Sequence, residues 1–150
     1  YKNIDRVKIK GIEVKLSYQI TKALEIYTNA ALQDGKDRDT GYYITSIEPF
    51  SGVVGASYSS DNWGADATLR WAKSMTKVNA GQYINPGYAV LDLTAFVAIT
   101  DNIALRGGLF NAFNKKYTTF KSVAGSSEND HVDARTNPGR TVSAKLNFSF

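Results

Sequence analysis

The last ten residues of the chain alternate strictly between apolar and polar side chains up to the final residue. The apolar positions are Val142, Ala144, Leu146, Phe148 and Phe150, and the polar positions are Thr141, Ser143, Lys145, Asn147 and Ser149. A period of two is typical of a β-strand with one apolar and one polar face. A terminal Phe-Ser-Phe is unusual in a water-soluble domain. It suits the last strand of an outer-membrane barrel, which faces lipid on one side and a wet lumen on the other.

Six further segments alternate in the same way, with apolar residues or glycine at every second position of 12–20, 24–32, 50–58, 65–71, 91–99 and 103–109, Thr28 being the exception. We expect the first strand to start near residue 6 and the sixth to continue to Tyr117. Short turns near residues 21, 60 and 101 alternate with long polar connections over 34–49, 77–87 and 118–139. Short turns at one end of the strands and long loops at the other are typical of bacterial outer-membrane barrels.

Charged side chains in the middle of these segments fall on the polar face. They are Glu13, Lys15, Glu25, Asp66, Arg70, Asp92, Arg106 and Lys145, whereas Lys8, Lys10 and Lys73 lie toward strand ends. A charge that faces lipid at the midplane of a bilayer costs about 2–4 kcal/mol. The pattern is therefore explained if the apolar face meets lipid and the polar face meets water. We therefore expect Glu13, Lys15, Asp66, Arg70, Asp92, Arg106 and Lys145 to line the wall of a lumen.

A soluble β-sandwich would show the same alternation, with its apolar face inside. Three features favour the barrel: the strand length, the alternation of loop lengths, and aromatic residues at the ends of the apolar faces. These aromatic residues are Tyr18, Tyr58, Phe148 and Phe150, with Trp63 at a short turn.

Composition excludes several classes of protein. The 150 residues have a mean hydropathy of −0.30, and no stretch approaches the ~18 apolar residues of a membrane helix. The chain has no cysteine, which excludes disulfides and thiolate metal sites. Its net charge of +4 is dispersed, without a basic run that would indicate nucleic acid. Its one histidine has no Ser or Cys partner at a recognisable motif, so we expect no enzyme.

The chain begins at Tyr1 without a signal peptide and shows seven strands, an odd number that does not close a usual bacterial barrel. We expect it to be the C-terminal piece of a larger barrel. A small passive or structural barrel of eight strands is the alternative, and it needs one more strand upstream. An outer-membrane lipase or protease would need a convergent Ser/His or acidic site, and the sequence shows none.

Four motifs resemble those of TonB-dependent outer-membrane receptors. They are NPGYAVLDLTA at 85–95, LRGGLFNAFNKKY at 105–117, NPGR at 137–140 before the final strand, and NIDRVKIKGIE at 3–13. Within that family, TSIEP at 45–49 and the run from Lys115 to Gly125 are similar to elements of haem, haemoglobin and haemophore receptors.

The resemblance implies an all-β fold, a transmembrane antiparallel β-barrel of about 22 strands, of which residues 1–150 supply the last seven. The plug and the earlier strands would lie upstream. It implies a receptor in the outer membrane of a Gram-negative bacterium that imports haem from haemoglobin or a haemophore. Haem would be the transported ligand, with no intrinsic cofactor. A ferric-siderophore receptor is the alternative.

The same resemblance implies the partners of the complete protein. They are the TonB–ExbB–ExbD complex acting through the plug, haemoglobin or a haemophore, outer-membrane lipid and lipopolysaccharide, and the barrel-assembly machinery, with no nucleic acid.

The long loops carry the candidate contact residues. Tyr42, Tyr43 and Tyr83 are aromatic residues of the kind that anchor protein partners. His131 is either a haem ligand or a solvated loop histidine. Glu128, Asp130 and Asp133 beside it lack the spacing of a known calcium loop, so we expect no metal site.

Overall fold

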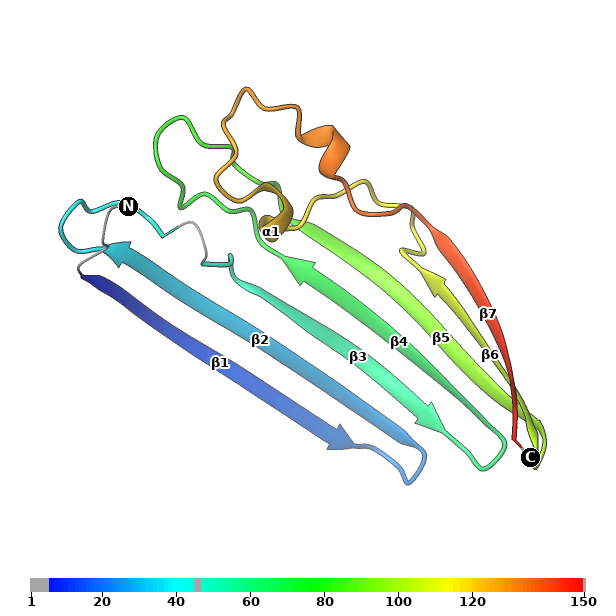
Figure 1. The fold of residues 1–150 in the computed structure, drawn as a ribbon. Coiled ribbons are helices and arrows are strands. Elements are labelled where there is room, and N and C mark those ends of the chain that lie inside the picture. Colours follow the sequence, from blue (N-terminus) through cyan, green and yellow to red (C-terminus); the bar gives the residue numbers. More distant parts are fainter. Residues whose placement is uncertain (1–5, 45–46, 150) are drawn as a thin grey trace.

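The computed structural model describes residues 6–44 and 47–149. Phe150 and the motif residues at 3–5 and 45–46 lie outside this part. Seven strands form one antiparallel sheet in sequential order, as Figure 1 shows. They are β1 (Val7–Gln19), β2 (Leu24–Asp37), β3 (Ser51–Ser59), β4 (Trp63–Ala72), β5 (Tyr88–Thr100), β6 (Ile103–Phe110) and β7 (Thr141–Phe148). The expected all-β antiparallel fold is confirmed.

The strands pair in phase, so that the side chains of cross-strand neighbours lie on the same face of the sheet. One row is apolar on all seven strands: Tyr18, Ile26, Ala56, Ala67, Leu93, Leu109 and Val142. The next row is polar or glycine throughout: Gln19, Glu25, Ser57, Asp66, Thr94, Gly108 and Ser143. Since side chains alternate across a strand, the rows divide the sheet into an apolar and a polar face.

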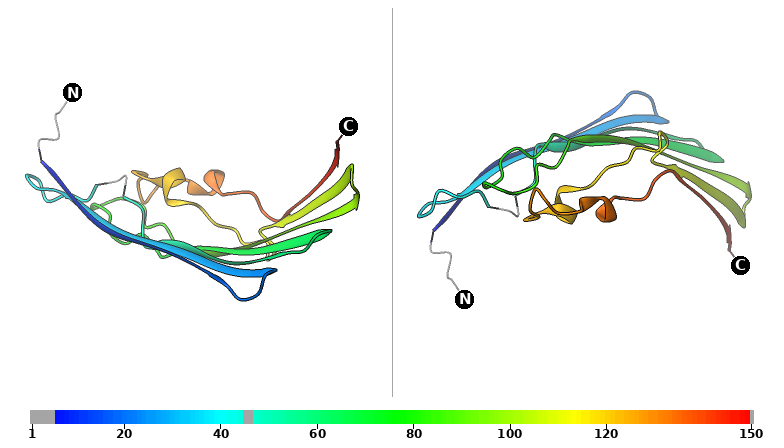
Figure 2. Two further views of the ribbon diagram at one scale, coloured as in Figure 1. Left: turned by 90° about the horizontal axis from the view of Figure 1, so that it is seen from below. Right: turned by 90° about the horizontal axis from the view of Figure 1, so that it is seen from above.

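The sheet is curved, and its polar face is the concave one. Figure 2 shows residues 111–140 passing over the concave side. Two residues of the polar face are buried there: Val90, which is 1% exposed, and Gly35, which lies under Ile47. The apolar face is convex, and many of its large side chains are exposed, for example Ile12 at 69%. Within the described residues no second layer covers it, so the sandwich alternative fails.

Aromatic pairs mark both ends of the convex face. Near the short turns, the rings of Tyr58 and Trp63 lie 4.5 Å apart between centroids. Near the long loops, Phe50 meets Trp71 edge-on at 4.9 Å. Two aromatic bands flanking an apolar belt are typical of a barrel wall in a bilayer.

Short and long connections alternate as expected, but two strand ends differ from the sequence prediction. Strand β2 continues to Asp37, through residues that we expected in a loop, because β1 supplies backbone partners as far as Val7. Strand β6 stops at Phe110 instead of reaching Tyr117. There Asn111 adopts a left-handed backbone with φ of 50°, and its side chain binds the carbonyls of Lys115 and Pro138.

The connection 111–140 is folded rather than simply polar. It contains the short helix α1 (Phe120–Val123) and a 3₁₀ turn at Val132–Arg135. In the described residues, no helix is long and apolar enough to span a bilayer.

We predict that an arginine is tolerated on the concave face and not on the convex face. Leu93→Arg should lower the free energy of unfolding by about 2–4 kcal/mol in lipid vesicles, because the charge would face hydrocarbon. Thr94→Arg, one residue along β5, is the matched control and should change it by much less. Denaturant unfolding of the full-length receptor measures both variants. Equal costs would contradict the assignment of the two faces.

Candidate functional site

The middle of the concave face carries ion pairs and hydrogen bonds between neighbouring strands. Arg70 on β4 donates from Nε and Nη2 to Oδ2 of Asp92 on β5, at 3.0 and 2.8 Å. Asp92 Oδ1 also accepts from the backbone N–H of Asn111 at 2.8 Å. The pair therefore connects the wall to the start of the last long loop.

A second group of hydrogen bonds crosses from β2 to β4. The Tyr27 hydroxyl donates to Asp66 Oδ2 at 3.0 Å and lies 2.7 Å from the Thr68 hydroxyl, which in turn donates to Asp66 Oδ1. Tyr27 reaches across β3 because Gly55 lies beneath it. A Cβ at Gly55 would come within 2.4 Å of the tyrosine ring. Asp66 is thus held in one position on the wall.

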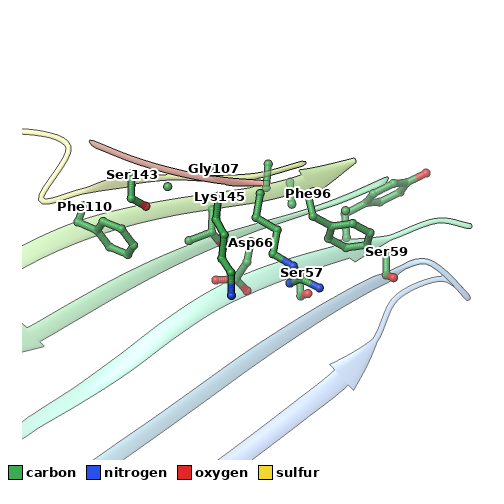
Figure 3. Close-up of a pocket in the computed structure, with 15 residues that line it drawn as sticks. Ser57, Ser59, Asp66, Phe96, Gly107, Phe110, Ser143 and Lys145 are labelled. Atoms are coloured by element: carbon green, nitrogen blue, oxygen red, sulfur yellow. The ribbon is translucent and has the colours of Figure 1, made fainter. Parts of the chain in front are cut away.

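A depression with a volume of about 440 Å³ lies on this face toward the short turns, and Asp66 is one of its lining residues (Figure 3). Arg106 and Lys145 line it as register partners on β6 and β7. Arg106 lies over the ring of Phe96, 5.4 Å from its centroid, and Phe96 lies against Gly64. Within the described residues, no carboxylate is within ion-pair distance of Arg106 or Lys145. This part of the wall can hold an acidic group from outside the chain.

The remaining predicted wall residues lie on the edge strand β1. Lys15 and Glu13 are on the same face and form an ion pair at 3.2 Å. Both side chains are mostly exposed, so the pair contributes little to stability. The structure therefore places all seven predicted wall residues on the concave face, in four groups along it.

The long loops are joined to one another above the wall. Asn85, which is 2% exposed, donates to the Thr118 carbonyl at 3.2 Å, and the Thr118 hydroxyl donates to Asn85 Oδ1. Asn79 exchanges two hydrogen bonds with the backbone of Tyr43. Lys121 reaches Glu48 at 3.2 Å. These contacts tie together the connections 38–50, 73–87 and 111–140.

The small apolar core of the described residues lies under these loops. It consists of Ile47, Met75, Val90, Phe120 and Val123. One residue or more comes from each long loop, from α1 and from β5. The loops are therefore positioned by shared burial as well as by hydrogen bonds.

The candidate contact residues of the long loops lie in different environments. Tyr42 is 65% exposed. Tyr43 and Tyr83 are half-buried and line one small cavity together, and the ring of Tyr43 has Lys36 Nζ 4.5 Å from its centroid. His131 is exposed at the start of the 3₁₀ turn and lines none of these cavities.

The acidic residues around His131 do not form a metal cage. Within residues 6–44 and 47–149, no three His, Asp or Glu side chains come together as metal ligands would. Asp133 instead binds Lys116 at 2.8 Å, and this hydrogen bond holds the pKa of the Asp133 carboxyl below its ordinary value.

The sequence pattern did not identify three residues that are buried under the long loops: Phe120, Val123 and Thr118. Phe120 and Val123 have the i, i+3 spacing of a helical apolar face, a signal too short to notice within a polar loop. The buried partner of Asn85 is Thr118, which is distant in sequence, so no local pattern could have identified it.

Comparisons with known proteins identify the relatives of the chain. The family described as "TonB dependent receptor-like, beta-barrel" matches residues 1–112. The "Heme/hemopexin utilization protein C" of Haemophilus influenzae is 30% identical over 142 residues, which is 89% of this chain and 20% of that protein. The "Hemoglobin and hemoglobin-haptoglobin-binding protein" of Haemophilus ducreyi is 26% identical, covering 82% of this chain and 16% of that protein.

Relatives with other names also match. The "Vitamin B12 transporter BtuB" of Vibrio vulnificus is 28% identical, covering 99% of this chain and 22% of that protein. The chain thus spans about a fifth of the length of the relatives it matches. These proteins are receptors and transporters, which confirms the expectation of a non-enzymatic chain.

Two solved structures share the fold. The copper transporter OprC superposes with a TM-score of 0.84 at 25% identity, over 96% of this chain and 24% of that one. A mutant of the ferric enterobactin receptor of Pseudomonas aeruginosa gives 0.76 at 21% identity, over 95% of this chain and 22% of that one. The sheet therefore corresponds to part of such a barrel.

We predict that the Asn85–Thr118 pair keeps the long loops together. Thr118→Val removes one hydroxyl at nearly constant shape and leaves the buried Asn85 amide without its donor, a loss of about 1–3 kcal/mol. Amide hydrogen exchange over 118–128 in the full-length receptor should become about tenfold faster or more. Thr76→Val, at an exposed threonine of the neighbouring loop, is the control and should leave exchange unchanged. Unaltered exchange in Thr118→Val would show that the loops do not depend on this pair.

Proposed function

Because the chain belongs to the TonB-dependent receptor β-barrel family, we propose that it forms part of an outer-membrane receptor that takes up haem from haemoproteins or a haemophore. The match to the haem/hemopexin utilization protein, over 89% of the chain, is the observation that supports haem as the cargo. The match to the haemoglobin-binding protein of Haemophilus ducreyi supports a haemoprotein as its source.

In this proposal residues 1–150 are the C-terminal part of one transmembrane barrel domain, and the plug and the earlier strands come from the rest of the protein. The length of the relatives, about five times that of the matched region, supports this division. TonB–ExbB–ExbD would act through the plug, and the barrel-assembly machinery would insert the barrel into the outer membrane.

The concave wall would face the lumen and the plug. Arg106 and Lys145 are available to a carboxylate of the plug, because neither forms an ion pair with Asp66 in the same depression or with any other acid of the described residues. Arg70 is hydrogen-bonded to Asp92, and Tyr27 to Asp66, within the wall itself. These two contacts would keep the wall rigid. A plug that moves during transport would then exchange contacts mainly at Arg106 and Lys145.

The outer loops would meet the haemoprotein. Tyr42 is the most accessible of the predicted contacts, and Tyr43 and Tyr83 stiffen the loops from within their shared cavity. His131 is exposed and is the one histidine of the sequence, so within these 150 residues it is the imidazole that would be offered to a haem iron.

A ferric-siderophore receptor is the second candidate. The superposition on a ferric enterobactin receptor shows the fold alone, and the vitamin B12 transporter match indicates that the family carries unrelated cargoes. Titration of the full-length receptor with haem, haemoglobin and ferric siderophores separates the candidates. We expect a shift of the Soret band with haem and no competition by siderophores. Binding of siderophores alone would exclude the haem proposal and leave the receptor class intact.

We predict that the ring of Tyr42 contributes to haemoprotein binding. Tyr42→Ala should weaken the affinity for haemoglobin by about tenfold, because exposed aromatic anchors commonly contribute more than 1 kcal/mol to an interface. Tyr42→Phe keeps the ring and should retain most of the affinity. Binding isotherms with the full-length receptor measure both. An alanine variant that binds as well as the wild type would remove Tyr42 from the interface.

A further inference from the structure

The depression on the concave face results from the order of large and small side chains along three strands. One row of register partners on β5, β6 and β7 is bulky: Phe96, Arg106 and Lys145. The next row toward the long loops is small: Thr94, Gly108 and Ser143. Beyond it, Phe110 on β6 is bulky again and lines the same depression. A row of small side chains between large ones thus leaves the space of about 440 Å³.

Two aromatic rings lie against the wall of this depression. A Cβ at Gly64 would collide with the ring of Phe96, and a Cβ at Gly108 would come within 2.7 Å of the ring of Phe110. Both rings are therefore close to the backbone of the sheet, and Phe110 is 38% exposed. Figure 3 shows the Lys145 side chain between the two rings in this view. Because these rings are apolar and face a wet lumen, another flat apolar surface would cover them favourably.

The depression has an excess of positive charge. Asp66 is the one acid among its lining residues, and its two oxygens accept hydrogen bonds from the hydroxyls of Tyr27 and Thr68. Arg106 and Lys145 form no ion pair with Asp66 or with another acid in the part of the chain that the structure describes. Two neighbouring cations are therefore free to bind a ligand with carboxylate groups.

We propose that the depression is a transit site for haem, occupied after the plug has moved aside. This rests on the proposed haem uptake and adds a site to it. Haem carries two propionate carboxylates on one edge of a flat, largely apolar ring system. Arg106 and Lys145 suit the two carboxylates, and the rings of Phe96 and Phe110 suit the flat surface. A plug carboxylate alone would use the cations but would give the two rings no role.

The position of the depression suits a late stage of passage. The short turns of bacterial outer-membrane barrels face the periplasm, and the long loops face the outside. Haem received at the long loops would therefore reach this part of the wall afterwards. A site along a pathway must bind its cargo well enough to admit it and weakly enough to release it. Asp66 moderates the attraction of the two cations for a dianion, which favours release.

The first test measures haem import by cells that make the full-length receptor, expressed per haem bound at the cell surface. Arg106→Gln/Lys145→Gln should lower this rate about fivefold or more, because haem loses both charged contacts inside the barrel. The control Lys10→Gln/Lys22→Gln removes the same charge on the convex face and at a short turn, and it should stay within about twofold of the wild type. Equal rates in the two variants would overturn the proposal.

A second variant distinguishes a haem site from a plug contact. Phe96→Leu/Phe110→Leu removes both rings and keeps every charge, and it should lower import about threefold or more. Import at the wild-type rate in this variant, with slow import in the charge variant, would assign the cations to the plug alone and exclude the transit site. A wild-type receptor without a Soret shift on haem titration would contradict the proposed function itself. Normal haem binding with unchanged import in both variants would refute the transit site only.

Discussion

The in-phase pairing of seven strands is the constraint on which the rest of the structure depends. Each strand alternates, but only a common register turns seven alternations into one apolar and one polar face. A slip of one residue between β4 and β5 would place Leu93 beside Asp66 in one direction, or Leu69 beside Asp92 in the other. Within the described strands one irregularity occurs, between Ala98 and Thr100 next to a short turn, and the pairs from Leu93 to Ala98 stay in phase. The β-sheet thus acquires two different surfaces without a second layer.

The two faces obtain stability in different ways. On the concave face, polar groups satisfy one another across strands, as Arg70 does with Asp92, and the loops bury a small core against β5. The convex face has no protein partner in the described residues, and its exposed apolar belt is stable only if hydrocarbon covers it.

The sequence predicted the strands and their phases well because a period of two is a local signal. The seven wall residues fell on one face for that reason. Strand ends were predicted less well, since the last residues of β2 are held by β1 and Asn111 ends β6 through distant contacts with Pro138. The inward fold of 111–140 was missed because it depends on Asn85 and Glu48, far away in sequence.

The central claim is that lipid covers the convex face and water or the plug covers the concave face. Since this chain has no cysteine, single cysteines placed at 91–97 of β5 in the full-length receptor can carry spin labels in lipid vesicles. Accessibility to oxygen, which concentrates in hydrocarbon, should be high at positions 91, 93, 95 and 97 and low at 92, 94 and 96. Equal accessibility along the strand, or the opposite phase, would contradict the account.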